Sequence, residues 1–239
     1  MPIKAVLFDM FDTLMLIEKN HEFYSPSLMR MYRYLNKNGI DVPFNKFNSA
    51  YIEARDSLYA KADLNFEEPH FNVRISEALK SLGYNHEVTS PLVAAATNEF
   101  CEEFMKYVHI DENAKAVVKG LHGKYKLGII SNFAIPECVH KLLKADCLEG
   151  LFDVIVVSGA VNKRKPSPEI FKNTLKKLSV SASETVFVGD TIDADIEGPK
   201  AVGMKVVFIK RREQKASEKF SPDQTIDSLN ELPLAIEGC

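Results

Sequence analysis

The chain contains 239 residues with a formal net charge of -3 at pH 7, and 46% of its residues are hydrophobic and 26% are charged. These values are typical of a globular protein with a full hydrophobic core, and they exclude fibrous and intrinsically disordered classes. The small negative charge excludes an overall electrostatic field that would attract nucleic acid or an anionic membrane.

The cysteines and the first residues indicate the compartment. The four cysteines are scattered without a CxxC pair, and the start of the chain lacks the basic, apolar and small-residue pattern of a signal peptide. No apolar stretch approaches the roughly 20 residues that cross a bilayer. We therefore expect a cytoplasmic protein with reduced thiols.

The first predicted element is a strand in residues 3–8. This run is apolar and β-branched, which is typical of a strand buried on both faces, and it ends at Asp9. In open parallel α/β sheets, ligands bind in the crevice beyond the carboxyl ends of the strands. Asp9 is therefore well placed for chemistry.

Residues 21–110 show helical periodicity and few β-branched runs. Ser25 and Pro26 predict the start of one helix, and Gly39 its end. Further helices are predicted after Pro43, in residues 71–82, and from near Pro91. Their apolar faces could close into a small bundle. We expect residues 17–111 to form an inserted helical cap domain.

From residue 112 onward, strands alternate with helices, which predicts a parallel sheet with helices on both faces. The expected fold class is thus α/β, with a Rossmann-like three-layer α/β/α core built from residues 1–16 and 112–239. The polar stretch 211–222 is expected to be a surface loop. The remaining core strands are predicted at residues 127–130, 154–157, 185–188 and 205–209.

Polar residues follow several of these strands, so they should gather at the edge of the sheet where Asp9 lies. Taken singly, each has an ordinary explanation: Ser131 could cap the next helix, and Lys165 could be an exposed loop lysine. Clustered carboxylates, however, repel each other unless a cation or a donor network offsets the charge, and a metal is the simplest solution. The groups are Asp9 with Thr13, Ser131 with Asn132, Lys165, and Asp190 with Asp195.

The order and spacing of these four groups resemble the haloacid dehalogenase superfamily of aspartate-nucleophile hydrolases over nearly the full chain. The helical insert is similar to that family's cap domain of the first type. The resemblance implies that Asp9 attacks phosphorus or carbon, that Ser131 and Thr13 donate hydrogen bonds to the oxyanion, and that Lys165 balances charge.

The resemblance also implies a Mg²⁺ site, because Mg²⁺ prefers oxygen ligands in near-octahedral geometry. The expected metal-site residues are Asp9, the backbone carbonyl of Phe11, Asp190 and Asp195. Asp195 would orient a metal-bound water or Lys165. Asp193 could instead cap the helix that starts there.

Phe11 departs from the pattern of the family's phosphatases, which usually have an Asp two residues after the nucleophile as general acid. The family's 2-haloacid dehalogenases have an aromatic residue there, and a Ser-Asn pair like Ser131-Asn132. Retention of Asp190 and Asp195 favours metal-dependent phosphoryl chemistry, and Asp12 could partly replace the missing acid.

A Mg²⁺-dependent phosphatase of a small phosphorylated metabolite is therefore favoured. The alternatives are a metal-independent 2-haloacid dehalogenase and a weakly catalytic binding protein with the same fold. We expect a small-molecule substrate and a monomer or homodimer, with no nucleic-acid or membrane partner.

The substrate is expected to contact the first strand's link to the cap and the cap itself. His21 lies in that link and is a candidate contact, together with Phe11, Asp12, Ser131 and Asn132. Four cap arginines could bind a substrate anion, although a helix arginine usually lies on a solvated face or in a surface ion pair. They are Arg30, Arg33, Arg55 and Arg74.

Overall fold

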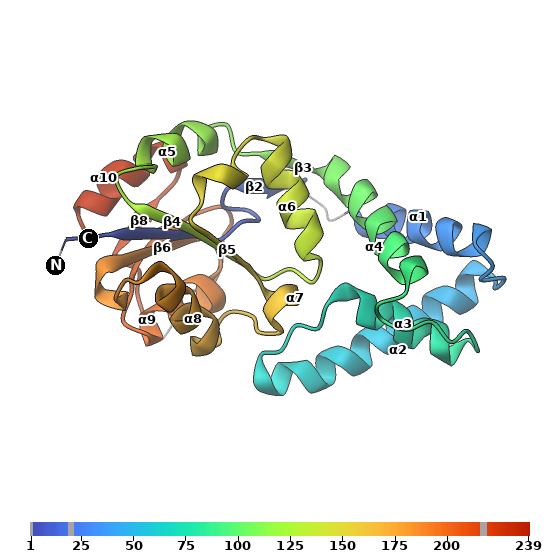
Figure 1. The fold of residues 1–239 in the computed structure, drawn as a ribbon. Helices are drawn as coiled ribbons and strands as arrows, with labels where there is room; N and C mark the ends of the chain where they lie inside the picture. The colour runs from blue at the N-terminus through green and yellow to red at the C-terminus, as the bar shows by residue number, and fades with distance from the viewer. Residues whose placement is uncertain (1, 19–21, 216–218) are drawn as a thin grey trace.

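The computed structural model describes residues 2–18, 22–215 and 219–239, and it contains a six-stranded sheet in the order β5-β4-β1-β6-β7-β8 (Figure 1). All neighbouring strands of this sheet are parallel. The five predicted strands are confirmed within two residues at each end, whereas β8 was not predicted. The strands are β1 (Ala5–Phe8), β4 (Lys126–Ser131), β5 (Val154–Val157), β6 (Thr185–Gly189), β7 (Lys205–Ile209) and β8 (Gln224–Ile226).

The sheet is buried on both faces, because its strands are apolar at successive positions. Val6 and Phe8 belong to the larger core on one face, and Ala5 and Leu7 belong to the core on the other. Figure 1 shows helices on both sides of the sheet, which confirms the predicted α/β/α fold class. These helices are α5 (Ala114–Leu121), α6 (Pro136–Ala145), α7 (Ser158–Val161), α8 (Pro168–Leu178), α9 (Gly198–Ala201) and α10 (Leu232–Glu237).

The helical insert lies to one side of the sheet in Figure 1 and is entered and left through a short antiparallel pair, β2 (Met15–Ile17) and β3 (Val108–Ile110). This pair was not predicted from the sequence. We keep residues 17–111 as the proposed cap domain and residues 1–16 with 112–239 as the proposed core. The cap helices are α1 (Tyr24–Lys37), α2 (Phe44–Ala62), α3 (Phe71–Ser81) and α4 (Pro91–Phe104).

Local sequence accounts for the ends of these cap helices. Pro43 directly precedes α2, and Pro91 is the first residue of α4, where the Ser90 hydroxyl accepts a hydrogen bond from the Val93 amide. The predicted start of α1 at Ser25 is wrong, because that helix already begins at Tyr24. No helix in the described ranges is both long enough and apolar enough to cross a membrane.

Candidate active site

Three adjacent strands end at the same level of the sheet and present polar residues there. Phe8 pairs with Ile129 on one side and with Val188 on the other. The residues that follow line a cavity of about 460 Å³ at the carboxyl edge, as expected for an α/β sheet. Its walls include Asp9, Phe11, Asp12, Asn132, Lys165, Asp190, Asp193, Asp195 and Arg212.

Lys165 lies at the centre of this site. Its Nζ donates hydrogen bonds to Asp9 Oδ1 at 2.5 Å and to Asp195 Oδ1 at 2.7 Å. The residue is only 3% exposed, so it is not a loop lysine in solvent. Burial lowers its pKa, but the two carboxylates more than offset this effect, and the net pKa is raised. The ammonium therefore stays charged.

Asn132 holds the backbone of Lys165 in place. Its Nδ2 donates to the Lys165 carbonyl at 2.9 Å, and its Oδ1 accepts from the Lys165 amide at 2.7 Å. Both polar atoms of the Asn132 side chain are thus used within the protein. Asn132 thus positions Lys165, and its expected part in catalysis and substrate binding stays a prediction.

Asp9 has the surroundings of a nucleophile. Burial raises the pKa of its carboxyl to about 6, Lys165 opposes the rise and Asp195 adds to it. The group is still ionised at neutral pH. Because Oδ1 accepts the hydrogen bond from Lys165, Oδ2 is the oxygen available for attack.

Asp195 accepts hydrogen bonds from Lys165 and from two backbone amides. Its Oδ1 binds Lys165, and its Oδ2 accepts from the amides of Asp190 at 3.1 Å and Thr191 at 3.0 Å. A Cβ on Gly189 would lie 2.5 Å from the Asp195 side chain, so only glycine allows this close approach. Of the two roles expected for Asp195, the structure supports orientation of Lys165.

Asp190 is a buried carboxyl that lies beside the carboxyls of Asp9 and Asp195. Burial, together with the nearby Asp9 and Asp195 carboxylates, raises the pKa of Asp190 to about 8, although Arg212 opposes the rise. Arg212 Nη1 lies 2.9 Å from Asp190 Oδ2, but without hydrogen-bond geometry, so this oxygen has no hydrogen-bond partner within the described residues. Ligand atoms of Asp9, Asp190 and Asp195 lie within 4.8 Å of one another, so these residues fit a divalent cation.

Two buried hydroxyls complete the site. Thr13 and Ser131 are fully buried, and neither Thr13 Oγ1 nor Ser131 Oγ has a hydrogen-bond partner in the described part of the chain. Leaving a buried hydroxyl without a hydrogen-bond partner costs about 1–3 kcal/mol. Both hydroxyls are therefore suited to donate a hydrogen bond to an anionic oxygen of a ligand. Ser131 caps no helix, because α6 begins only at Pro136.

Phe11 directs an aromatic ring into the wall of the cavity. Its ring centroid lies 4.8 Å from that of Phe133 and 5.7 Å from that of Phe104, which belongs to α4. The position of the usual general acid is therefore part of an aromatic cluster between the cap and the core.

Asp12 and Asp193 have local structural roles. Asp12 adopts a left-handed backbone conformation, with φ of 58°, and its Oδ1 accepts from the Ile17 amide at 3.2 Å. Its Oδ2 accepts from Arg212 at 3.1 Å, so this carboxylate is a poor replacement for the missing acid. The expectation that Asp193 caps its helix is wrong, because the π-helix Ile192–Glu197 has Thr191 at its N-cap. His21 lies outside the described residues.

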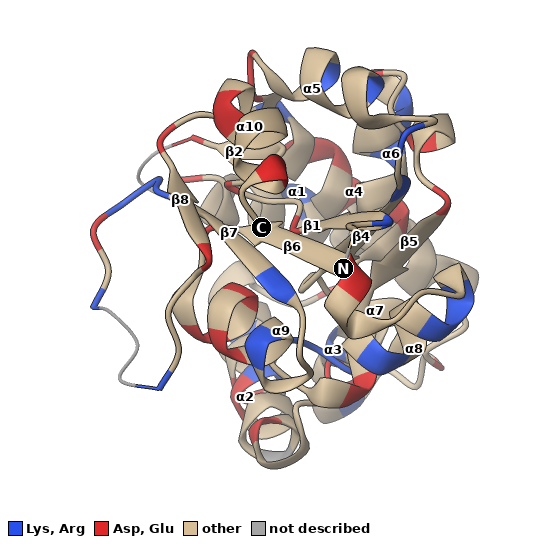
Figure 2. Cartoon of the chain, turned by 90° about the vertical axis from the view of Figure 1, so that its left-hand side faces the viewer, with Lys and Arg blue, Asp and Glu red and all other residues tan. Residues whose placement is uncertain are grey.

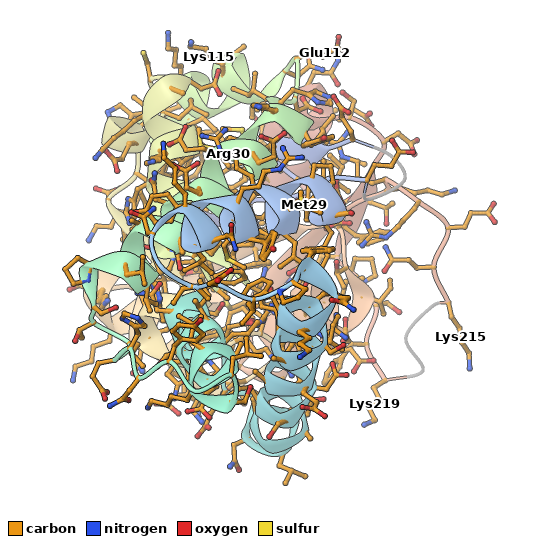
Figure 3. All side chains as sticks on the ribbon, turned by 90° about the vertical axis from the view of Figure 1, so that its right-hand side faces the viewer. Met29, Arg30, Glu112, Lys115, Lys215 and Lys219 are labelled. Atoms are coloured by element: carbon orange, nitrogen blue, oxygen red, sulfur yellow. The ribbon has the colours of Figure 1, made fainter. Side chains whose placement is uncertain are left out.

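The sequence reading missed residues from the segment after β7. Arg212 contacts both Asp12 and Asp190, and Gln214 Nε2 donates to the Asp190 carbonyl at 2.5 Å. The segment was predicted to be a surface loop, and residues 211–215 do lie outside any helix or strand, but the contacts of Arg212 and Gln214 with the site were not predicted. Further along, Lys215 and Lys219 do project away from the body of the protein (Figure 3). The signal available in the sequence was the position of Arg211-Arg212 just beyond a strand end.

Comparison with known proteins shows that the sequence of this chain is similar to a family of hydrolases and to named phosphatases. Residues 55–209 match the family described as haloacid dehalogenase-like hydrolase. The chain is 30% identical over 208 residues to a glyceraldehyde 3-phosphate phosphatase from Pyrococcus abyssi, an alignment that covers 87% of this chain and 82% of that protein.

Solved structures show the same architecture. A HAD phosphatase from Thermococcus onnurineus aligns over 99% of both chains with a TM-score of 0.66 and 26% identity. A 2-haloacid dehalogenase from Pseudomonas syringae pv. Tomato DC3000 aligns over 98% of both chains with a TM-score of 0.76 and 23% identity, which shows a shared fold alone. The resemblance predicted from the sequence is confirmed: the chain belongs to the haloacid dehalogenase-like hydrolase family.

Proposed function

We propose that this hydrolase cleaves the phosphate monoester of a small metabolite, with Mg²⁺ as cofactor and Asp9 as nucleophile. The observation that carries the proposal is the cluster of three buried carboxyls, Asp9, Asp190 and Asp195, whose ligand atoms lie within 4.8 Å of one another, as a bound cation would require. The phosphatase names of its relatives support the same chemistry. We further propose a cytoplasmic monomer or homodimer, and all four cysteines of the chain are free thiols in the structure.

The residues divide the work as follows. Asp9 Oδ2 attacks phosphorus, the bond from phosphorus to the ester oxygen breaks, and the leaving oxygen takes its electron pair and then a proton from solvent. Thr13 and Ser131 donate hydrogen bonds to the phosphoryl oxygens, while Lys165 holds Asp9 in line. Water then attacks phosphorus and loses a proton to solvent, which releases inorganic phosphate and restores the Asp9 carboxylate.

The cation would be held by Asp9 and Asp190, with the Phe11 carbonyl as the third protein ligand expected from the family pattern. When bound, it supplies positive charge that offsets these carboxylates and the phosphoryl oxygens. With Phe11 in place of the general acid, the protein itself offers no proton to the leaving oxygen. We therefore expect esters with good leaving groups to react much faster than alkyl phosphates.

The second candidate function is 2-haloacid dehalogenation, which the aromatic residue at position 11 favours because halide leaves without a proton. The buried carboxyl of Asp190 opposes it. An anionic haloacid would meet both Asp9 and Asp190, with no cation needed for its own chemistry.

The two functions differ in product and in metal requirement. We expect the purified protein to release phosphate from 4-nitrophenyl phosphate with Mg²⁺ and to lose this activity with a chelator or with Asp9→Asn. Chelator-insensitive release of chloride from 2-chloropropionate would establish dehalogenation instead. If neither assay exceeds the Asp9→Asn control, the protein is a binding protein on this fold.

A further inference from the structure

A second cavity of about 280 Å³ adjoins the active site. The two cavities share Asn132 and Arg164 in their walls, so the second continues from the place where the nucleophile lies. It is formed between the cap helices and the loop after β4. Half of the residues in its wall are aromatic, namely Phe23, Tyr24, Tyr59, Phe71, Phe100 and Phe133.

Two arginines line this cavity, and Arg164 is paired with Asp63 whereas Arg74 is not paired with a carboxylate in the described part of the chain. The side chain of Arg74 is buried, with 8% of the residue exposed, and within the described residues no carboxylate oxygen lies within the 4.0 Å of an ion pair. Its Nη1 donates to the Tyr51 hydroxyl and its Nη2 to the Tyr59 hydroxyl, both at 3.1 Å, whereas Nε has no partner. A buried guanidinium with an unused donor is costly unless an anion meets it.

The rings around Arg74 fix the direction of its guanidinium. Its Cζ lies 5.0 Å from the ring centroid of Phe71, 5.2 Å from that of Tyr59 and 5.7 Å from that of Tyr51. Cation–π contacts offset part of the desolvation cost, and they leave the hydrogen-bonding edge oriented before any ligand arrives. Burial lowers the pKa of Arg74, the surrounding tyrosines raise it, and the net pKa is raised, so the group is charged.

The other three cap arginines do not share this environment. Arg30, labelled in Figure 3, pairs with Glu99 at 2.6 Å and Glu103 at 3.4 Å. Arg55 pairs with Asp56 at 2.7 Å, and Arg33 is exposed. Of these four arginines, Arg74 alone is both buried and without a carboxylate partner.

Glu68 places one carboxyl in the same wall. It is buried, accepts a weak hydrogen bond from the Ser158 hydroxyl at 3.4 Å, and makes no ion pair with Arg74. The Glu68 carboxyl can accept a hydrogen bond from a hydroxyl or amino group of the ligand. It also favours a ligand whose negatively charged group lies next to Arg74.

We propose that this cavity binds the leaving group of the substrate and that Arg74 binds its carboxylate. The substrate is then the phosphate monoester of a small carboxylic acid with an aromatic or apolar body. This inference rests on the proposed phosphatase function for its kinetic test, but the subsite can be tested separately by binding.

The kinetic test uses phenyl phosphate and 4-carboxyphenyl phosphate, which differ only in the carboxylate. We expect the wild-type protein to prefer the carboxylated ester by about tenfold or more in kcat/KM, since a hydrogen bond to a charged group is of that strength. Arg74→Gln should bring the ratio of the two kcat/KM values close to one. Arg33→Gln is the matched control, because Arg33 is an exposed cap arginine outside the cavity and its removal should leave the ratio unchanged.

The equilibrium test does not require catalysis. We expect benzoate to bind to the wild-type protein in calorimetry and to bind at least about tenfold more weakly to Arg74→Gln. If neither ester is hydrolysed but benzoate binding depends on Arg74, the phosphatase proposal fails and the subsite stands. Equal ester ratios and equal benzoate affinities in the two proteins would overturn the subsite.

Two smaller substitutions test the subsite if the Arg74→Gln protein does not fold. Tyr59→Phe keeps the ring but removes the hydroxyl that accepts a hydrogen bond from Arg74 Nη2. The loss of this hydrogen bond should lower benzoate affinity several-fold. Glu68→Gln removes the opposing carboxylate and should raise that affinity. Unchanged affinity in both variants would also contradict the proposal.

Discussion

Phe11 is the residue at which the sequence and the family pattern disagree most, and the structure shows what the ring does. It packs against Phe133 of the core and Phe104 of the cap, so it joins the two parts beside Asp9. A carboxylate at this position would lose those contacts. It would also leave a charge against two aromatic rings, which is unfavourable unless the group turns toward the cavity.

We expect Phe11→Asp to raise kcat for alkyl phosphates by on the order of a hundredfold, because it restores a proton donor near the leaving oxygen. The same change should lower the free energy of unfolding by about 3 kcal/mol through lost packing. Steady-state kinetics and urea unfolding measure the two effects. Phe11→Asn is the control, since it is similar in size and has no acidic proton; equal gains in both variants would disprove the role of the acid.

Glu68 provides a pH test at a single residue. Burial raises its pKa above its ordinary value of 4.5, although Arg164 and Arg74 oppose this. The folded protein therefore holds the proton more tightly than the unfolded chain, and the resulting stabilisation is full below pH 4.5 and is lost as the pH rises through the folded pKa. We expect Glu68→Gln to gain stability relative to the wild type between about pH 4 and pH 8.

Urea midpoints across that pH range measure this difference. Glu67→Gln is the control for removing one negative charge at a neighbouring position, and its difference from the wild type should vary less with pH. A Glu68→Gln protein that becomes less stable than the wild type as the pH rises would contradict the expected direction.

At the scale of elements, the segment after β7 holds the turn that follows Asp9 in place. Arg211 donates to the carbonyls of Asp12 and Thr13, both at 3.0 Å, and to Asp111 Oδ2 at 2.7 Å. It therefore joins the start of the cap, its end and the C-terminal part of the sheet. Figure 2 shows the later part of this segment extending away from β7 and β8, with acidic and basic residues along it.

Removing Arg211 should be costly, because Asp111 and the two carbonyls would lose their donor. The Arg211 side chain is 18% exposed and that of Asp111 is 6% exposed, so solvent replaces the lost contacts only in part. We expect Arg211→Ala to lower the free energy of unfolding by about 2–3 kcal/mol, or about 5–10 °C in Tm. Arg212→Ala is the control: its side chain is 49% exposed, and we expect a change below about 1 kcal/mol. Equal losses in thermal unfolding would show that Arg211 has no special role.

At the scale of the whole molecule, the cap and the core meet through aromatic, backbone and surface side-chain contacts. Near Asp9, Phe104 of α4 is stacked on Phe133 at 5.2 Å between centroids, and the Phe71 amide donates to the Ala134 carbonyl at 2.9 Å. At the surface, the contacts are polar side-chain pairs. These pairs are Asp63 with Arg164, Glu102 with Lys141, and Glu137 with His70.

Exposed pairs of this kind contribute about 0.2–1 kcal/mol each. We expect the triple variant Asp63→Asn, Glu102→Gln and Glu137→Gln to lose about 1–2 kcal/mol of stability in total, a few degrees in Tm. High salt should remove most of the difference between this variant and the wild type, because about 1 M salt screens charges within about 3 Å. A difference that persists in calorimetric scans at high salt would mean that the pairs act through packing.

The sequence by itself determined the parts of the fold that depend on neighbours along the chain. The core strands and the helices after Pro43 and at Pro91 follow from periodicity and from proline or serine at their ends. The order of polar residues after successive strands also predicted that Asp9, Ser131, Lys165 and Asp190 would gather at one edge of the sheet, because parallel strands bring their carboxyl ends together there.

Tertiary structure alone decided which side chains are buried, which are paired and which keep an unused donor. Arg212 reaches Asp12 from 200 positions away, and no local pattern encodes such a contact. In the same way, Arg74 differs from the other cap arginines only through the rings and hydroxyls that surround it. The physical reason is that desolvation and electrostatic pairing depend on the groups nearby in space, which chain folding brings together from distant segments.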